Sequence, residues 1–341
     1  MFKSGQISSP VRDSNMELLR IPAMLLVLVV HADFMALHLP TVTELHLTPL
    51  SSFLRIFIGA ISTVCVNIFV LISGWYGIKL KASSLAKIIF QTFFFCILMY
   101  LCFGTDFSFN AIFHECKDIF LLRHYWFLRA YILLMLMAPI MNTFAEHASK
   151  QEFKWIIIGY FVFQTLFSYF GNDVWYHDGY SPLLFFGIYL LGRYMRLYTP
   201  AWTSLQYKWN ISIFLLVNLL ITIISISFLH WGLGGGRMFN YTSPLVIIAS
   251  IFLFLFFTKL DIKNSFVNWI AKSCFAVYLL HANPHFIDKW FVEVISRWWE
   301  TASGWQFLWY VSIYCLSIFA VAILIDKVQM RLFNLMLRRQ K

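Results

Sequence analysis

The sequence has few charged residues and no long polar stretch. Asp, Glu, Lys and Arg make up 12% of its 341 residues, against roughly 25% in an average soluble domain. Hydrophobic residues make up 60% and aromatic residues 19%, and apolar runs recur from Leu18 to Phe333. This leaves no room for a large soluble domain, so the composition predicts an integral membrane protein.

The usual sequence signals of metal, phosphate and hydrolase sites are also missing. There is no Cys-x-x-Cys pair, no Cys/His spacing typical of metal ligands and no Gly-x-Ser-x-Gly motif. The glycine-rich stretch 231–240 lacks the Lys-Ser/Thr pair of a phosphate loop. We therefore expect no metal site and no permanently bound cofactor. The six cysteines are expected to pack as small apolar side chains, with a Cys102–Cys116 disulfide as an alternative.

The apolar runs have the length of membrane-spanning helices, which need roughly 20 mostly apolar residues. Their continuity favours helices over the alternating strands of a barrel. We expect an all-α polytopic bundle of about ten helices, forming one domain over residues 1–341 with a basic tail at 327–341. The first helix is expected to be retained, because it is longer than the core of a signal peptide. The expected helices are 18–38, 53–77, 86–104, 125–145, 154–171, 181–198, 210–230, 242–258, 266–284 and 305–326.

Lys and Arg collect at one set of helix ends. With the N-terminus inside the cell, 18 of the 26 basic residues fall in inside segments, and Lys272 lies close to that side. By the positive-inside rule, both termini face the cytoplasm. This topology explains the net charge of +10 without a nucleic-acid partner. The basic residues placed outside are Arg55, Lys117, Arg123, Arg129, Arg237, Lys289 and Arg297.

The two longest outside connections, 105–124 and 285–304, mix aromatic, acidic and basic residues. This pattern is typical of amphipathic segments on a membrane surface.

The first expected helix carries ionisable residues near both ends. Arg20 and His31 are eleven residues apart, close to three full turns, so they share one face. Glu17 lies one turn before Arg20 and can pair with it. Ionisable groups within a membrane usually face a protein interior or a water-filled path. We place Arg20 at the cytoplasmic mouth of such a path and His31 about 16.5 Å further along it. A topology signal for Arg20 and an interhelical hydrogen bond for His31 are the alternatives.

A first helix with Glu-x-x-Arg, followed by His eleven residues after the Arg, resembles that of the acyltransferase 3 family of membrane acyltransferases. Three later stretches resemble the family in the same order. Residues 67–81 contain Ser-Gly-aromatic, residues 124–142 contain Trp-Phe-Leu and a later Pro, and residues 275–284 contain Tyr-Leu-x-His.

The resemblance implies an enzyme that moves an acyl group, commonly acetyl from cytoplasmic acetyl-CoA, to a hydroxyl of a cell-surface glycan or lipid-linked saccharide. It also implies the plasma (inner) membrane of a bacterium. The roles of the family's essential first-helix Arg and His carry over to Arg20 and His31. The family's paired arginines after the second helix are replaced by Lys79 and Lys81, which can hold phosphate as point charges but without a bidentate fork.

The chemistry gives these residues separate roles. An alcohol attacks a thioester efficiently only when a base takes its proton, which is the role we expect for His31. An acyl-histidine intermediate is the alternative. Arg20 is expected to hold phosphates of the donor. The candidate substrate-binding residues are Glu17, Asn67, Ser73, Lys79, Lys81, Trp126, Arg129, Tyr278, His281 and Asn283.

Two other classes of protein fit the composition. A transporter or flippase of a lipid-linked saccharide also uses many helices and buried polar groups, although clear repeats and paired broken helices are not seen. A structural membrane partner would not need Arg20 and His31 on one face. The acceptor, the acyl length and the oligomeric state, including a homo-oligomer, are left open.

Overall fold

The computed structural model describes residues 13–171 and 175–338, and every regular element within these ranges is helical. Eight helical segments there are long and apolar enough to cross a membrane. The expected all-α polytopic fold is therefore confirmed. The eight segments are Ser14–Leu37, Pro49–Tyr76, Ala82–Phe103, Trp126–His147, Lys150–Phe170, Tyr207–His230, Gly235–Thr258 and Gly304–Leu335.

Shorter helices, 3₁₀ turns and π-helical segments connect or extend the long helices. The elements in chain order are α1 (Ser14–His31), η1 (Ala32–Leu37), α2 (Val42–Leu47), α3 (Pro49–Ser62), α4 (Cys65–Tyr76), α5 (Ala82–Phe103), α6 (Phe109–Phe120), α7 (Trp126–His147), α8 (Lys150–Phe163), η2 (Gln164–Phe170), η3 (His177–Gly179), α9 (Pro182–Tyr198), η4 (Ala201–Ser204), α10 (Tyr207–His230), η5 (Gly235–Phe239), α11 (Pro244–Thr258), α12 (Ser265–Ala271), α13 (Cys274–His281), α14 (Pro284–Phe286), η6 (Ile287–Val292), α15 (Glu293–Thr301) and α16 (Gly304–Arg338).

Two of the ten expected spans differ from the other eight. α9 has 17 residues, about 25 Å at 1.5 Å per residue, which is short of a hydrocarbon core of about 30 Å. The expected helix 266–284 is interrupted, because α12 ends at Ala271 and α13 begins at Cys274. The interruption holds Lys272, a residue that lines the cavity described below.

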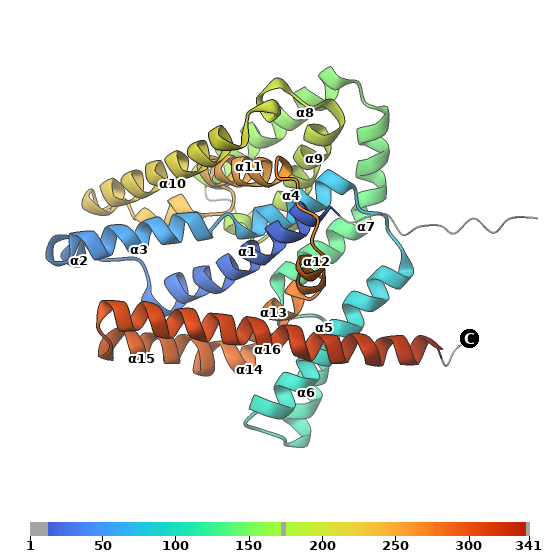
Figure 1. The fold of residues 1–341 in the computed structure, drawn as a ribbon, viewed down its shortest axis with the longest axis vertical. Helices are drawn as coiled ribbons and strands as arrows, with labels where there is room; N and C mark the ends of the chain where they lie inside the picture. Colours follow the sequence, from blue (N-terminus) through green and yellow to red (C-terminus); the bar gives the residue numbers. More distant parts are fainter. Residues whose placement is uncertain (1–12, 172–174, 339–341) are drawn as a thin grey trace, which may run out of the picture.

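α1 occupies the middle of the bundle in Figure 1, between α3, α10 and α11 on one side and α13 to α16 on the other. The beginning of α1 and the end of α16 lie on the same side of the molecule. This arrangement fits two termini on one side of a membrane, and their cytoplasmic location stays a prediction. Lys3, Arg12, Arg339 and Lys341, which contributed to it, lie outside the described residues.

Helices α4 and α9 cross closely because glycines stand at the crossing. A Cβ atom at Gly74 would overlap the carbonyl oxygen of Tyr189, and one at Gly192 would lie 2.9 Å from the carbonyl oxygen of Leu71. Small residues are what close approach of two membrane helices requires. This contact gives a structural reason for the glycine of the Ser-Gly-aromatic stretch.

Arg55 on α3 fixes the chain that follows His31. Its Nη2 donates to the carbonyl oxygens of Leu37 (2.9 Å) and His38 (2.8 Å), at the end of the π-helical η1. Its Nη1 pairs with Glu44 at 2.9 Å. The guanidinium carbon also lies 4.8 Å from the ring centroid of Trp299. Arg55 thus ties η1 to α2 and α15.

The two long connections that are predicted to lie outside form short helices, α6 in one and α14, η6 and α15 in the other. α6 lies at the edge of the bundle, beyond the end of α5 (Figure 1). All six cysteines are free, so Cys102 and Cys116 form no disulfide here.

Candidate active site

One face of α1 borders a cavity of about 580 Å³. Arg20, Met24, Val27 and His31 line it at steps of four, three and four residues, the repeat of a single helix face. Arg20 and His31 therefore share a face and a cavity, as their spacing predicts.

The Arg20 end of this cavity is basic. Arg20 Nη1 donates to both carboxylate oxygens of Glu17, at 2.9 and 3.0 Å, so the expected ion pair is present. Lys87 of α5 and Lys272, between α12 and α13, also line the cavity. Three cations from three parts of the chain thus line one cavity, which suits an anionic ligand.

At the other end, His31 is bonded to a second histidine. His281 is fully buried, and its Nδ1 lies 2.6 Å from the carbonyl oxygen of Val277. A carbonyl oxygen only accepts, so Nδ1 of His281 carries the proton, and in a neutral ring its Nε2 is then an acceptor. His281 Nε2 lies 3.0 Å from His31 Nδ1. His31 Nδ1 is therefore the donor, and its Nε2 retains a lone pair, by assignment from the hydrogen-bond network.

A second cavity, of about 480 Å³, meets the first at His31. Among the residues that the structure describes, no Lys or Arg lines it, whereas His124, Tyr180 and several other aromatic residues do. Trp126, Tyr241 and Tyr278 line both cavities together with His31. We call the first the basic cavity and the second the aromatic cavity.

The predicted substrate-binding residues divide into three groups. Ser73, Trp126 and Tyr278 line the cavities. Others support the walls from behind: Asn67 Nδ2 donates to the carbonyl oxygen of Tyr241 at 3.2 Å, and Asn283 Nδ2 donates to the Tyr125 hydroxyl at 2.9 Å. His281 is hydrogen-bonded to His31, and Glu17 is paired with Arg20. The third group, Lys79, Lys81 and Arg129, is exposed and does not line either cavity.

Several cavity residues were not among the predicted site residues. Lys272 lies within an apolar run, where its charge indicates only topology, and no sequence motif marks Tyr241. Asn240 and Gly236 belong to the glycine-rich stretch 231–240, which turns out to line the aromatic cavity. Side chains that meet only through packing of distant helices leave no local sequence signal.

These features define a polytopic membrane protein with a buried polar site between two cavities. A family model described as an acyltransferase domain, acyltransferase 3, matches residues 13–327. The chain therefore belongs to the acyltransferase 3 family and is a membrane acyltransferase, as the resemblance implied. Comparisons with curated proteins and with solved structures found no match.

Proposed function

We propose that this protein is an O-acetyltransferase that moves the acetyl group of acetyl-CoA to a hydroxyl of a saccharide in the inner membrane of a bacterium. The observation that carries the proposal is that His31 lies where the basic cavity and the aromatic cavity meet. One imidazole can thus reach a donor from one side and an acceptor from the other.

The basic cavity suits the donor. The 580 Å³ volume lies within the roughly 300–1,000 Å³ of small-molecule sites. Arg20, Lys87 and Lys272 offer charge-assisted hydrogen bonds to the phosphates of CoA. The α1 face then leads the thioester arm from Arg20 to His31, about 16.5 Å along the helix. CoA is a cytoplasmic metabolite, so this cavity opens to the cytoplasm in the proposed topology.

The lone pair on Nε2 of His31 suits a general base. The acceptor oxygen bonds to the thioester carbonyl carbon while Nε2 takes the hydroxyl proton. His281 accepts the hydrogen bond of the other ring nitrogen and so stabilises the imidazolium that forms. When the C–S bond breaks, the CoA sulfur leaves with the bonding electrons and receives the proton from Nε2. An acyl-histidine route uses the same lone pair as nucleophile and is the alternative.

The aromatic cavity suits a saccharide acceptor. Tyr180, Tyr241 and Trp126 offer flat apolar faces against which a sugar ring can stack, and their polar atoms can bond hydroxyls. Asn240 and His124 add hydrogen-bonding groups. Family membership favours this reading over a saccharide transporter, whose substrate would have to pass His31 unmodified.

The experiment is acetyl transfer by the purified full-length protein in detergent. We expect CoA thiol to be released only when acetyl-CoA and a glycan acceptor are both present, with a mass gain of one acetyl group on the acceptor. Release of CoA with no acetylated acceptor, for any glycan from the host envelope, would contradict the proposal. Loss of an acetyl group from the envelope glycans of a deletion strain would identify the acceptor.

The proposed sidedness is tested separately with topology reporters. Fusions after Lys150 and Lys341 are expected to read as cytoplasmic, and an insertion in 231–240 as outside. A cytoplasmic signal from 231–240 would place the aromatic cavity on the donor side and overturn the arrangement.

A further inference from the structure

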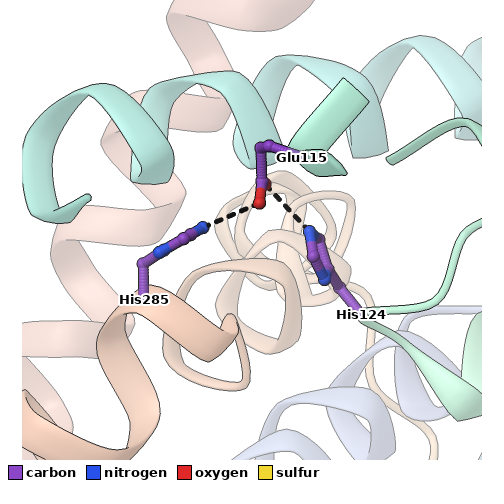
Figure 2. A group of neighbouring side chains, drawn as sticks. All are labelled: Glu115, His124 and His285. Atoms are coloured by element: carbon purple, nitrogen blue, oxygen red, sulfur yellow. Dashed lines mark hydrogen bonds and ion pairs between the residues drawn. The ribbon is translucent and has the colours of Figure 1, made fainter. Parts of the chain in front are cut away.

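The structure brings together a glutamate and two histidines, Glu115, His124 and His285, that are far from Arg20 and His31 in sequence. Glu115 lies on α6, His124 in the turn before α7, and His285 on α14. Figure 2 shows the two imidazoles pointing from opposite sides at one carboxylate. Glu115 Oε1 lies 2.9 Å from His124 Nε2, and Oε2 lies 3.1 Å from His285 Nε2.

We propose that Glu115, His124 and His285 bind a divalent transition metal ion, and that zinc is the ion that fits best. One potential ligand atom from each residue, a carboxylate oxygen and a ring nitrogen of each histidine, lies within 4.8 Å of the other two. Zinc bonds of about 2.0–2.1 Å in a tetrahedron place ligand atoms about 3.3 Å apart. To reach this separation, the two observed contacts would open by a few tenths of an ångström, and the two histidine nitrogens would adjust to the same value.

The ligand set and its burial support this assignment. Two imidazoles and one carboxylate, with a fourth position for water, are a recurrent zinc set. The side chains of Glu115, His124 and His285 are only 10%, 9% and 23% exposed. A buried carboxylate needs hydrogen-bonding or charged partners, and the partners of Glu115 are the two imidazoles. The neighbouring Arg123 does not supply the charge, because its guanidinium pairs with Asp118 at 2.9 Å.

The turn that carries His124 is held in an unusual conformation. Leu122 has φ of 52°, a left-handed conformation that is unfavourable for a residue with a side chain and persists only where the surroundings impose it. Arg123 N donates to the carbonyl oxygen of Asp118 at 2.9 Å, which closes the turn. The turn aims His124 at Glu115.

The site is joined to the active site through a short segment. His285 follows His281 by four residues, across the turn between α13 and α14. Between them the Asn283 side chain accepts from His285 N (3.0 Å) and donates to the Tyr125 hydroxyl (2.9 Å). His124, next to Tyr125, lines the aromatic cavity. A metal ion here would fasten α6 and the wall of the aromatic cavity to the segment that carries His281. The role is structural, and it is independent of the identity of the acyl group.

The test uses the full-length protein purified with a tag that contains no histidine run. After chelation, it is titrated with zinc in the presence of a competing indicator, and the bound metal is counted by mass spectrometry. We expect one equivalent per chain and a rise in the melting temperature. A cobalt(II)-loaded sample is expected to show the visible absorption of a four- or five-coordinate site.

Variants localise the ion. His285→Ala, His124→Ala and Glu115→Gln should each weaken binding by more than the roughly 10–100-fold cost of losing an outer hydrogen-bond partner of a ligand. His114→Ala is the matched control, because His114 is an exposed histidine on α6, the helix that carries Glu115. His285→Cys keeps a ligand atom and should retain zinc. A folded wild-type protein that binds less than a tenth of an equivalent, or equal affinity in the double variant His124→Ala/His285→Ala, would overturn the proposal.

Discussion

The Nδ1 atom of His31 lies 3.0 Å from the Nε2 atom of His281, across 250 residues of sequence. His281 in turn is anchored on the carbonyl oxygen of Val277. This chain of two hydrogen bonds sets the position of the proton on each ring, so in the proposed mechanism His281 is a positioning residue for His31.

A glutamine at position 31 separates a catalytic role from a structural one. His31→Gln can still bond to His281 but cannot take a proton at neutral pH. If His31 is the base, both His31→Gln and His31→Ala should lose about 10²–10⁴-fold in turnover, with donor binding retained. The measurement is acetyl transfer at saturating donor, with melting temperature as the folding control. Turnover near wild type in His31→Gln would exclude His31 as base or nucleophile.

Position 281 tests the hydrogen-bond chain. His281→Gln places an acceptor near the original Nε2 and should keep much of the turnover, whereas His281→Leu removes the acceptor and should lower kcat far more than it changes KM for the donor. If Gln and Leu are equally inactive while both variants fold, His281 takes part in the chemistry directly.

The cations of the basic cavity should determine donor affinity. Arg20→Ala removes a charged hydrogen-bond donor, an effect of about 1.5–3 kcal/mol, and should raise KM for acetyl-CoA by about 10–100-fold. Arg20→Lys should recover only part of it, because a point charge replaces a planar fork. Lys87→Ala and Lys272→Ala should also raise KM, since both line the cavity.

Lys79→Ala provides the comparison, because Lys79 is exposed and does not line that cavity. If Lys79→Ala raises the donor KM more than Lys87→Ala, the donor enters along the end of α4, and the family role of the paired basic residues belongs to Lys79 and Lys81.

Gly74 should tolerate no side chain. Gly74→Ala places a methyl group against the backbone of Tyr189, and overpacking of this kind costs typically 1–3 kcal/mol. We expect a lower melting temperature and reduced yield in the membrane. Gly159→Ala is the matched control, since its Cβ would meet nothing within 4 Å. Equal stability of the two variants would show that α4 and α9 cross less closely.

Acid should weaken the ion pair between Glu44 and Arg55, which holds the end of η1 in place. The backbone N–H of Thr41 is the main group that lowers the pKa of Glu44 below its usual range, with the hydrogen bond and charge of Arg55 adding to it. A lowered folded-state pKa means that Glu44 stabilises the fold above its usual pKa and loses this effect as the pH falls through the folded value. The gap in melting temperature between wild type and Glu44→Gln should therefore narrow in acid. A gap independent of pH would contradict an ionised role for Glu44.

Local features of the chain were predictable from sequence, and features formed by packing were not. Continuous apolar runs specify spanning helices, and the Glu17–Arg20 pair and the shared face of Arg20 and His31 follow from helix geometry alone. The break in the helix between Ala271 and Cys274 could not be predicted in this way, because no Pro or Gly lies there.

The long-range clusters could not be found in the same way. His285 lies 170 residues from Glu115, so no spacing rule joins them, and a search for short metal motifs passes over both. Lys272 reads as a topology signal until the cavity that it lines is known. Helix geometry and the family resemblance both pointed to Arg20 and His31, whereas the residues around them come together only through packing.

The meeting of two cavities at one histidine has a consequence for the membrane itself. A continuous column of water from one side to the other would conduct protons and discharge the gradient that energises the cell. In the proposed arrangement, with the two cavities open to opposite sides of the membrane, the four side chains common to both cavities, His31, Trp126, Tyr241 and Tyr278, would also have to block the passage of water and protons. The large side chain of Trp126 would then keep protons from crossing as well as contact the substrate. Proteoliposomes that contain the Trp126→Ala variant should leak protons even when no substrate is present.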